Sequence, residues 1–221
     1  MRLGWDCSET AMSEFLAQYG SEIVTLTIEH LWLTAAAMLF ATGISVPAGI
    51  WLTRSPRWAK PVIGVANVLQ TIPSLAMFGF LLRLPWLGER AARIAILALT
   101  AYALLPIVRN TYAGIRGIDR SVVEVAHALG LTGAQRLFKV ELPLAAPFIL
   151  AGLRTATVTC IGIATIAAAV GAGGLGELIF RGVASMDNRL VLAGAIPAAL
   201  LALGADAALG LVERWFKVSG Q

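Results

Sequence analysis

The sequence predicts an all-α, polytopic membrane protein with about five transmembrane helices, and two observations support this prediction. The first is composition: 58% of the 221 residues are hydrophobic and 14% are charged, whereas an average soluble domain carries about 25% charged residues. The mean hydropathy is correspondingly high, at +0.79. The second is that apolar runs recur along the chain, most of them near the length of about 20 residues that crosses a bilayer's hydrocarbon core.

Residues 1–28 precede the first apolar run and form a predicted N-terminal extracytoplasmic segment. They carry several carboxylates and little apolar content. Because they lack the basic start, short apolar core and cleavage site of a signal peptide, we expect the segment to be retained. Residues 29–217 are then expected to form a single transmembrane domain.

The apolar runs define the predicted spans. The third is short and lies between Arg93 and Arg109, whose side chains we expect to snorkel to the headgroups. Pro73 interrupts the second, where it removes a backbone N–H and should kink the helix. In order, the expected spans are 31–52, 61–82, 94–108, 145–170 and 190–212.

The distribution of lysine and arginine predicts an N-terminus outside and a C-terminus inside, because cytoplasmic loops carry the basic excess. With this orientation the polar loop 116–143 is cytoplasmic. The basic residues on the inside would be Arg54, Arg57, Lys60, Arg116, Arg120, Arg136, Lys139, Arg214 and Lys217, and those on the outside Arg2, Arg83, Arg90, Arg93, Arg181 and Arg189.

The polar loop contains a predicted amphipathic helix. Ser121 and Glu124 have the spacing of a capping box, which indicates a helix start. Gly130 is a residue type that commonly ends a helix, and a second helical stretch is expected over 134–142. One face of the first helix is apolar, at three- and four-residue steps. Its residues are Val122, Val125, Ala126 and Leu129.

The same loop resembles a known family motif. The pattern E-x-A-x3-G-x9-V-x-L-P is similar to the EAA loop of permease subunits from ATP-binding cassette (ABC) importers, although Val125 stands where that family has alanine. The residues that carry the resemblance are Glu124, Ala126, Gly130, Val140, Leu142 and Pro143. In such a loop Glu124 would hold the helix start, and Val140, Leu142 and Pro143 would anchor the loop to the next span.

The resemblance implies a type I importer permease fold in the bacterial inner membrane and a set of partners. These are cytoplasmic ABC ATPase subunits, a second permease subunit that is identical or a sister, and an extracytoplasmic substrate-binding protein. ATP would be used by the ATPase, and this chain would bind no cofactor. It would transmit the work of ATP hydrolysis through its loop rather than act as an enzyme.

Two further segments resemble one branch of these permeases. The stretch QTIPSLA at 70–76 and the stretch GAGGLG at 171–176 are similar to segments of quaternary-amine uptake systems for glycine betaine, choline or carnitine. The glycine stretch also occurs in methionine-type importers. An osmoprotectant is therefore the expected substrate, with another small solute such as an amino acid as the alternative. A gradient-driven transporter or channel is disfavoured by the loop motif and by the lack of two inverted repeats of comparable span number. A non-transporting membrane scaffold whose loop recruits a cytoplasmic partner is a second alternative.

Polar residues inside the second span and the glycine stretch are candidates for the translocation path. Lipid penalises exposed polar groups, so those near Pro73 should face protein or a water-filled path. Small residues let backbones approach closely, which favours a tight turn near an outer gate at the glycine stretch. GAGGLG also fits a dinucleotide fingerprint, but it lacks the strand that the fingerprint needs. The candidates are Asn67, Gln70, Thr71, Pro73, Ser74, Gly171, Gly173, Gly174 and Gly176.

Two ionisable residues within the predicted spans are expected to meet. Arg154 and Asp206 would each lie about 10 Å from the cytoplasmic end of a neighbouring span. Because an unpaired charge in the membrane is costly, they are predicted to form an ion pair.

The remaining residues give no indication of enzymatic chemistry. There is no G-x4-G-K-[ST] loop to bind ATP phosphates. His30 and His127 are expected to be interfacial or solvent-facing, and Cys7 and Cys160 to be ordinary thiols too few for a metal site. Nucleic-acid binding is not expected, because the basic residues are dispersed.

Overall fold

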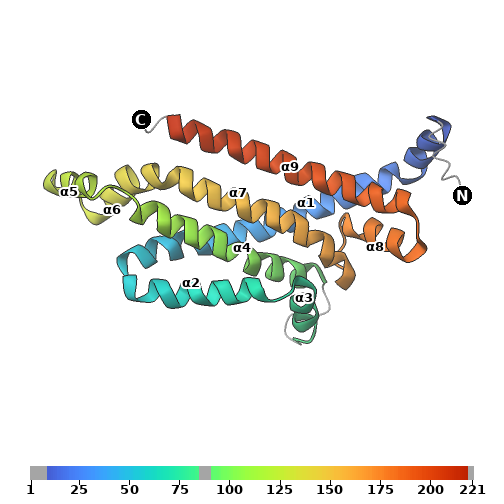
Figure 1. Ribbon diagram of the computed structural model, residues 1–221, viewed down its shortest axis with the longest axis horizontal. Helices are drawn as coiled ribbons and strands as arrows, with labels where there is room; N and C mark the ends of the chain where they lie inside the picture. Colours follow the sequence, from blue (N-terminus) through green and yellow to red (C-terminus); the bar gives the residue numbers. More distant parts are fainter. Residues whose placement is uncertain (1–8, 85–90, 219–221) are drawn as a thin grey trace, which may run out of the picture.

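The computed structural model describes residues 9–84 and 91–218, and these residues form helices and short connections with no β-strand (Figure 1). The predicted all-α fold class is confirmed. The elements are α1 (Glu9–Arg54), α2 (Pro56–Thr71), α3 (Ser74–Leu82), α4 (Ala91–Arg116), α5 (Arg120–Ala128), α6 (Gly133–Arg136), the π-helical η2 (Leu137–Glu141), α7 (Leu142–Ala167), the 3₁₀ turn η3 (Ala168–Val170), α8 (Gly176–Ser185) and α9 (Asn188–Val218).

The described helices confirm the predicted number of spans. Four stretches are long and apolar enough to cross a membrane: Gln18–Arg54, Ala91–Arg116, Gly133–Val170 and Asn188–Phe216. The fifth is the pair α2 and α3, which are bent by 94° at a short break. Helix α1 runs without interruption through residue 28, where the sequence suggested a boundary between the N-terminal segment and the membrane domain.

The third span is longer than the sequence suggested. Arg109 was expected to mark its end, yet α4 continues for two more turns, to Arg116. A charged residue does not end a helix, because the side chain of arginine leaves the backbone hydrogen bonds intact. Arg109 is thereby placed inside the helix and not at its end.

The long helices pack along the molecule, with α7 between α4 and α9 and with α1 crossing behind α4 and α7 and in contact with both (Figure 1). Many buried residues at these contacts are alanines, among them Ala37, Ala98 and Ala164, and small side chains allow close approach of helices in a membrane. Phe78 and Leu99 are fully buried and fill the remaining space. The core is therefore formed by closely spaced helices, and many of the side chains between them are small.

The break between α2 and α3 is held by α4. The hydroxyl group of Tyr102 donates to the carbonyl oxygen of Ile72, and Nε2 of Gln70 donates to the carbonyl oxygen of Tyr102 at 3.0 Å. Pro73 is the N-cap of α3 and supplies no backbone N–H of its own. The kink expected at Pro73 is thus a complete break, whose exposed carbonyl is paired by a neighbouring helix as the membrane requires.

The glycine stretch forms a tight turn between η3 and α8. Gly171, Gly173 and Gly174 have φ angles of 76°, 86° and 82°, in the left-handed region that other residues rarely adopt. The N–H group of Gly174 donates to Oε2 of Glu29 on α1 at 3.2 Å. A β-carbon added at Gly176 would lie 1.9 Å from the carbonyl oxygen of Thr165. The turn therefore needs glycine for its backbone angles and for close approach to neighbouring segments.

Replacing Gly176 with alanine is expected to destabilise the fold by about 1–3 kcal/mol, because the added methyl group overlaps the Thr165 carbonyl. The measurement is the melting temperature of the detergent-purified chain. Gly162→Ala is the matched control, since a β-carbon at that helical position meets nothing within 4 Å. Equal melting temperatures for the two variants would contradict the prediction.

Candidate functional site

The helix of the polar loop, α5, begins at a different cap from the one predicted. The side chain of Asp119 accepts a hydrogen bond from the N–H group of Ser121 at 2.8 Å, and this bond lowers the pKa of Asp119. Glu124 does not reach back to the helix start; its Oε1 accepts from Nε of Arg120 at 3.1 Å. The predicted Ser121–Glu124 capping box is therefore wrong, because an acidic residue two positions earlier occupies the N-cap.

Gly130 ends α5, as its residue type predicted. Its φ of 75° is left-handed, and the N–H of Leu131 donates to the carbonyl oxygen of Ala126 at 3.2 Å, as in a Schellman motif. A capping box is present one step later, where the side chains of Thr132 and Gln135 pair with each other's backbone N–H groups. The T-x-x-Q spacing could have identified it from the sequence.

The second part of the loop is the start of a long helix. From Gly133 the chain runs through α6 and η2 directly into α7. Val140, Leu142 and Pro143, the last residues of the motif, lie on this helix at the base of α7. A movement of α5 would therefore act near the start of a helix that continues as a predicted membrane span.

The apolar face of α5 is largely uncovered. Ala126 is buried, at 3% exposure, whereas Val122, Val125 and Leu129 are 38%, 59% and 75% exposed. Helices α5 and α6 project from one end of the molecule, where the α1–α2 junction and the C-terminus also lie (Figure 1). The predicted amphipathic helix thus presents apolar side chains that this chain does not cover.

A buried carboxylate joins the loop to α1. Glu141 is 2% exposed and accepts from Nε of Arg136 at 2.9 Å, and its other oxygen is paired with Nη2 of Arg54 at the end of α1. Sequence reasoning missed this network. The sequence signal that could have indicated it was an acidic residue, Glu141, among basic residues at the start of a span. Its partner Arg54 is 87 positions away and could not be identified from the sequence.

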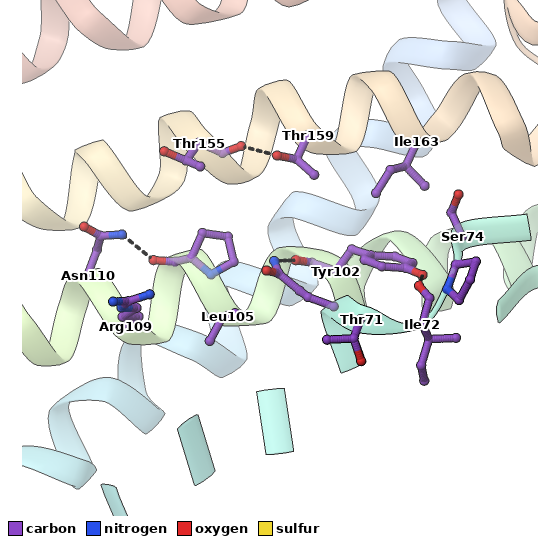
Figure 2. Close-up of a pocket in the computed structure, with 13 residues that line it drawn as sticks. Thr71, Ile72, Ser74, Tyr102, Leu105, Arg109, Asn110, Thr155, Thr159 and Ile163 are labelled. Atoms are coloured by element: carbon purple, nitrogen blue, oxygen red, sulfur yellow. Dashed lines mark hydrogen bonds between the residues drawn. The ribbon is translucent and has the colours of Figure 1, made fainter. Parts of the chain in front are cut away.

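Part of the predicted path lines a cleft of about 710 Å³ between α4, α7 and the α2–α3 break (Figure 2). Residues 70–74 form its wall at the break, and they include the predicted Gln70, Thr71, Pro73 and Ser74. Asn67 is exposed and does not belong to the lining. The polar groups around Pro73 therefore face a common cavity, with Asn67 outside it.

Sequence reasoning missed the other two walls of this cleft. The α4 wall includes Arg109 and Asn110, and Nδ2 of Asn110 donates to the carbonyl oxygen of Pro106 at 2.8 Å. The α7 wall includes Thr155 and Thr159, whose hydroxyl groups donate to backbone carbonyls one turn earlier at 3.0 and 2.8 Å. The sequence signals that could have identified these walls were the threonines that recur along the predicted span 145–170 and the proline within the predicted span 94–108.

Two of the four candidate glycines line a different cavity, and Gly174 and Gly176 belong to neither lining. A cleft of about 340 Å³ is bordered by Gly171 and Gly173 together with Glu29, Trp32 and Glu177. The two predicted parts of the path thus belong to separate clefts, one at the broken span and one at the glycine turn.

Arg154 and Asp206 lie together, as their positions on neighbouring spans suggested. Nε of Arg154 is 2.5 Å from Oδ1 of Asp206, and Nη2 is 2.6 Å from Oδ2, in a two-bond arrangement. Nη1 of Arg154 is also 3.6 Å from Oε2 of Glu213, which sequence reasoning did not include. These contacts connect α7 to α9.

The expectation for His30 is wrong. Its side chain is fully buried between α1 and α7, with Nε2 3.1 Å from the carbonyl oxygen of Ile161, because the glycine turn covers it at Gly174. His127 is exposed, as expected, and Cys160 is buried. No group of metal-ligating side chains occurs among residues 18–84 and 91–216, whose side chains the structure describes. Arg2, Cys7 and Arg90 lie outside the described residues.

The broken span, the polar cleft and the projecting amphipathic helix place the chain in a class of membrane transport subunits. The sequence matches the family described as "Binding-protein-dependent transport system inner membrane component" over residues 45–218, and the chain belongs to this family. It is therefore a multi-pass inner-membrane component of an ABC import system, which works with an ATPase and a substrate-binding protein. The predicted family is confirmed.

Curated relatives of the chain are named as permeases. It is 41% identical over 207 residues to the choline transport system permease protein OpuBB of Bacillus subtilis (strain 168), with 94% of each chain covered. It is 43% identical over 203 residues to the carnitine transport permease protein OpuCB of Listeria monocytogenes, with 92% of each covered. It is 42% identical over 186 residues to the osmoprotectant import permease protein OsmW of Salmonella typhimurium, with 83% of this chain and 86% of that one covered. These relatives are transport components and not enzymes.

A solved structure supports the fold. A chain of the MetNI methionine ABC transporter in an inward-facing conformation superimposes with a TM-score of 0.77 over 88% of this chain and 96% of that chain. The sequence identity is 22%, so the likeness concerns the fold alone. The type I importer permease fold expected from the sequence is confirmed.

Arg154→Asp and Asp206→Arg are each expected to reduce the amount of folded protein, because each places like charges side by side within a membrane-spanning segment. The combined variant should restore most of it. The measurement is the monodisperse fraction in size-exclusion chromatography of detergent-solubilised membranes. A double variant no better than the worse single variant would show that the ion pair does not hold α7 to α9.

Proposed function

We propose that this chain is the permease subunit of an ABC importer for small osmoprotectants such as glycine betaine, choline or carnitine. The observation that supports the substrate class is the identity of 41–46% to relatives named for choline, carnitine or glycine betaine transport, over about nine-tenths of the chain. The polar cleft suits such solutes, since it offers hydrogen-bonding groups in a membrane-spanning region.

The proposed orientation has the N-terminus outside and the C-terminus inside. Its support is that α5, the α1–α2 junction and the C-terminal end of α9 lie at the same end of the molecule, together with the basic residues Arg54, Arg57 and Arg214 (Figure 1). A second permease subunit, identical or a sister, would close the path. ATP would be bound by the ATPase, and this chain would hold no cofactor of its own.

Coupling would proceed through α5. Its exposed Val125 and Leu129 would be buried in a groove of the ATPase, where each fully buried side chain contributes about 1.5–3 kcal/mol. Ala126 permits close approach, and Gly130 sets the turn that directs the chain into the α6–α7 helix. Glu141 would pass the movement on to α1 through Arg54.

Gly130→Val is expected to reduce both copurification of the ATPase and ATP-driven uptake of glycine betaine by roughly tenfold, since a β-branched residue is strained by 1–2 kcal/mol or more at a left-handed position. Gly130→Asn should keep both, because asparagine tolerates this conformation. The measurements use proteoliposomes that contain the permease, its ATPase and its binding protein.

Gly133→Val is the matched control for this experiment, because its position is helical and a β-carbon there meets nothing within 4 Å. Full activity of Gly130→Val would contradict the coupling role. Wild-type proteoliposomes that import methionine but not glycine betaine, choline or carnitine would refute the proposed substrate class.

The orientation predicts that Ala128→Cys on α5 reacts with a membrane-impermeant thiol reagent only in inverted vesicles. Val183→Cys on α8, which is 63% exposed at the other end of the molecule, should react only in intact spheroplasts. Both substitutions are made with Cys7 and Cys160 replaced by serine, so that each variant carries one thiol. Labelling of Ala128→Cys from outside would reverse the proposed topology.

A further inference from the structure

We propose that the cleft between α4, α7 and the α2–α3 break binds a zwitterionic substrate during its passage, with Arg109 receiving the carboxylate. The inference rests on the proposed osmoprotectant function. It adds a specificity-determining residue and a preference for substrates that carry a carboxylate over those that carry only a cation.

The first argument is that Arg109 is a charge without a protein partner inside a span. It lies seven residues before the end of α4, about 10 Å along the helix axis. Its guanidinium group makes no hydrogen bond or ion pair with any other residue in the described part of the chain. Arg154, by contrast, is paired with Asp206 and lies near Glu213. The side chain of Arg109 is exposed and borders the cleft. A charge within a membrane faces water or a counter-charge, and in this cleft the substrate would bring the counter-charge.

The second argument is the chemistry of guanidinium. Its planar fork of N–H donors matches a carboxylate with two parallel hydrogen bonds, which are stronger than bonds between neutral groups. The cleft lining among the described residues contains no carboxylate that could compete for Arg109. Asn110, the next residue, already donates to Pro106. Arg109 is therefore the group in this lining best suited to a carboxylate.

The third argument is that Arg109 is the one charged side chain among the described lining residues. Figure 2 shows Arg109 and Asn110 at one end of the cleft and Ile72 and Ser74 at the other. The cation of a zwitterion held at Arg109 therefore meets no second positive side chain in this lining.

The α7 wall of the cleft adds hydrogen-bond acceptors. Thr155 and Thr159 use their hydroxyl protons on backbone carbonyls, so that their oxygens offer only lone pairs. These lone pairs suit the positive end of a zwitterion whose carboxylate is held by Arg109.

Arg109→Gln is expected to lower ATP-driven uptake of glycine betaine by roughly tenfold or more, the loss expected when charge-assisted hydrogen bonds are removed. Uptake of choline, which has no carboxylate, should stay unchanged or rise. Glycine betaine uptake by Arg109→Lys should lie between that of the wild type and that of Arg109→Gln, because lysine keeps the charge but lacks the planar fork of N–H donors. Arg93→Gln is the matched control, since Arg93 lies on the same helix and outside the cleft. All are measured in proteoliposomes with the ATPase and the binding protein.

A second measurement does not depend on uptake. Phenylglyoxal modifies accessible arginines, and mass spectrometry reports its extent at Arg109 and at Arg93 in the same wild-type sample. Glycine betaine should protect Arg109 but not Arg93, and choline should protect neither.

The outcomes separate the inference from the proposed function. Equal losses of glycine betaine and choline uptake in Arg109→Gln, or no loss of either, would overturn the assigned role. If the wild type imports neither substrate, the proposed function fails, and the protection measurement then decides the site. Protection of Arg109 by choline as strongly as by glycine betaine would refute carboxylate recognition.

Discussion

The requirement that backbone polar groups be paired within the membrane governs the architecture around the cleft. The chain breaks its second span at Ile72 and Pro73, and the break is tolerable because Tyr102 donates to the carbonyl that it exposes. Gln70 completes a reciprocal pair by donating to the carbonyl of Tyr102. The same bonds fix the broken span against α4 and hold the cleft open. The polar wall of the path is thus formed in part by the groups that repair the helix break.

Ionic contacts connect α7 to α1 and to α9. Glu141, buried between Arg54 and Arg136, ties the base of the α6–α7 helix to the end of α1. Removing one partner of a buried ion pair is strongly destabilising, so this connection resists separation. On the other side of α7, Arg154 and Asp206 tie it to α9. A displacement at α5 would therefore act on three membrane helices and not on α7 alone.

The sequence was informative where the chemistry is local. Apolar runs predicted the spans, Pro73 the break and Gly130 the end of α5, because each depends on backbone conformation or on contact with lipid. Among contacts between distant segments, the Arg154–Asp206 pair was predictable from two intramembrane charges at similar depth, but others were not. The partner of Glu141 is Arg54, 87 positions away. His30 is buried because α7 and the glycine turn cover it. Asp119 is the N-cap of α5 in place of the predicted Ser121, because either of these two nearby residues can cap a helix.

The charge balance of the cleft bears on why import needs a separate binding protein. A path must attract its substrate enough for entry and release it readily at the other side. In the proposed site one unpaired guanidinium receives the carboxylate, and no aromatic cage surrounds the cation among the lining residues described. Such a site orients a zwitterion and binds it weakly. Tight capture at low external concentration would then have to occur before the substrate reaches this chain, and the switch between inward and outward access would not have to overcome strong binding.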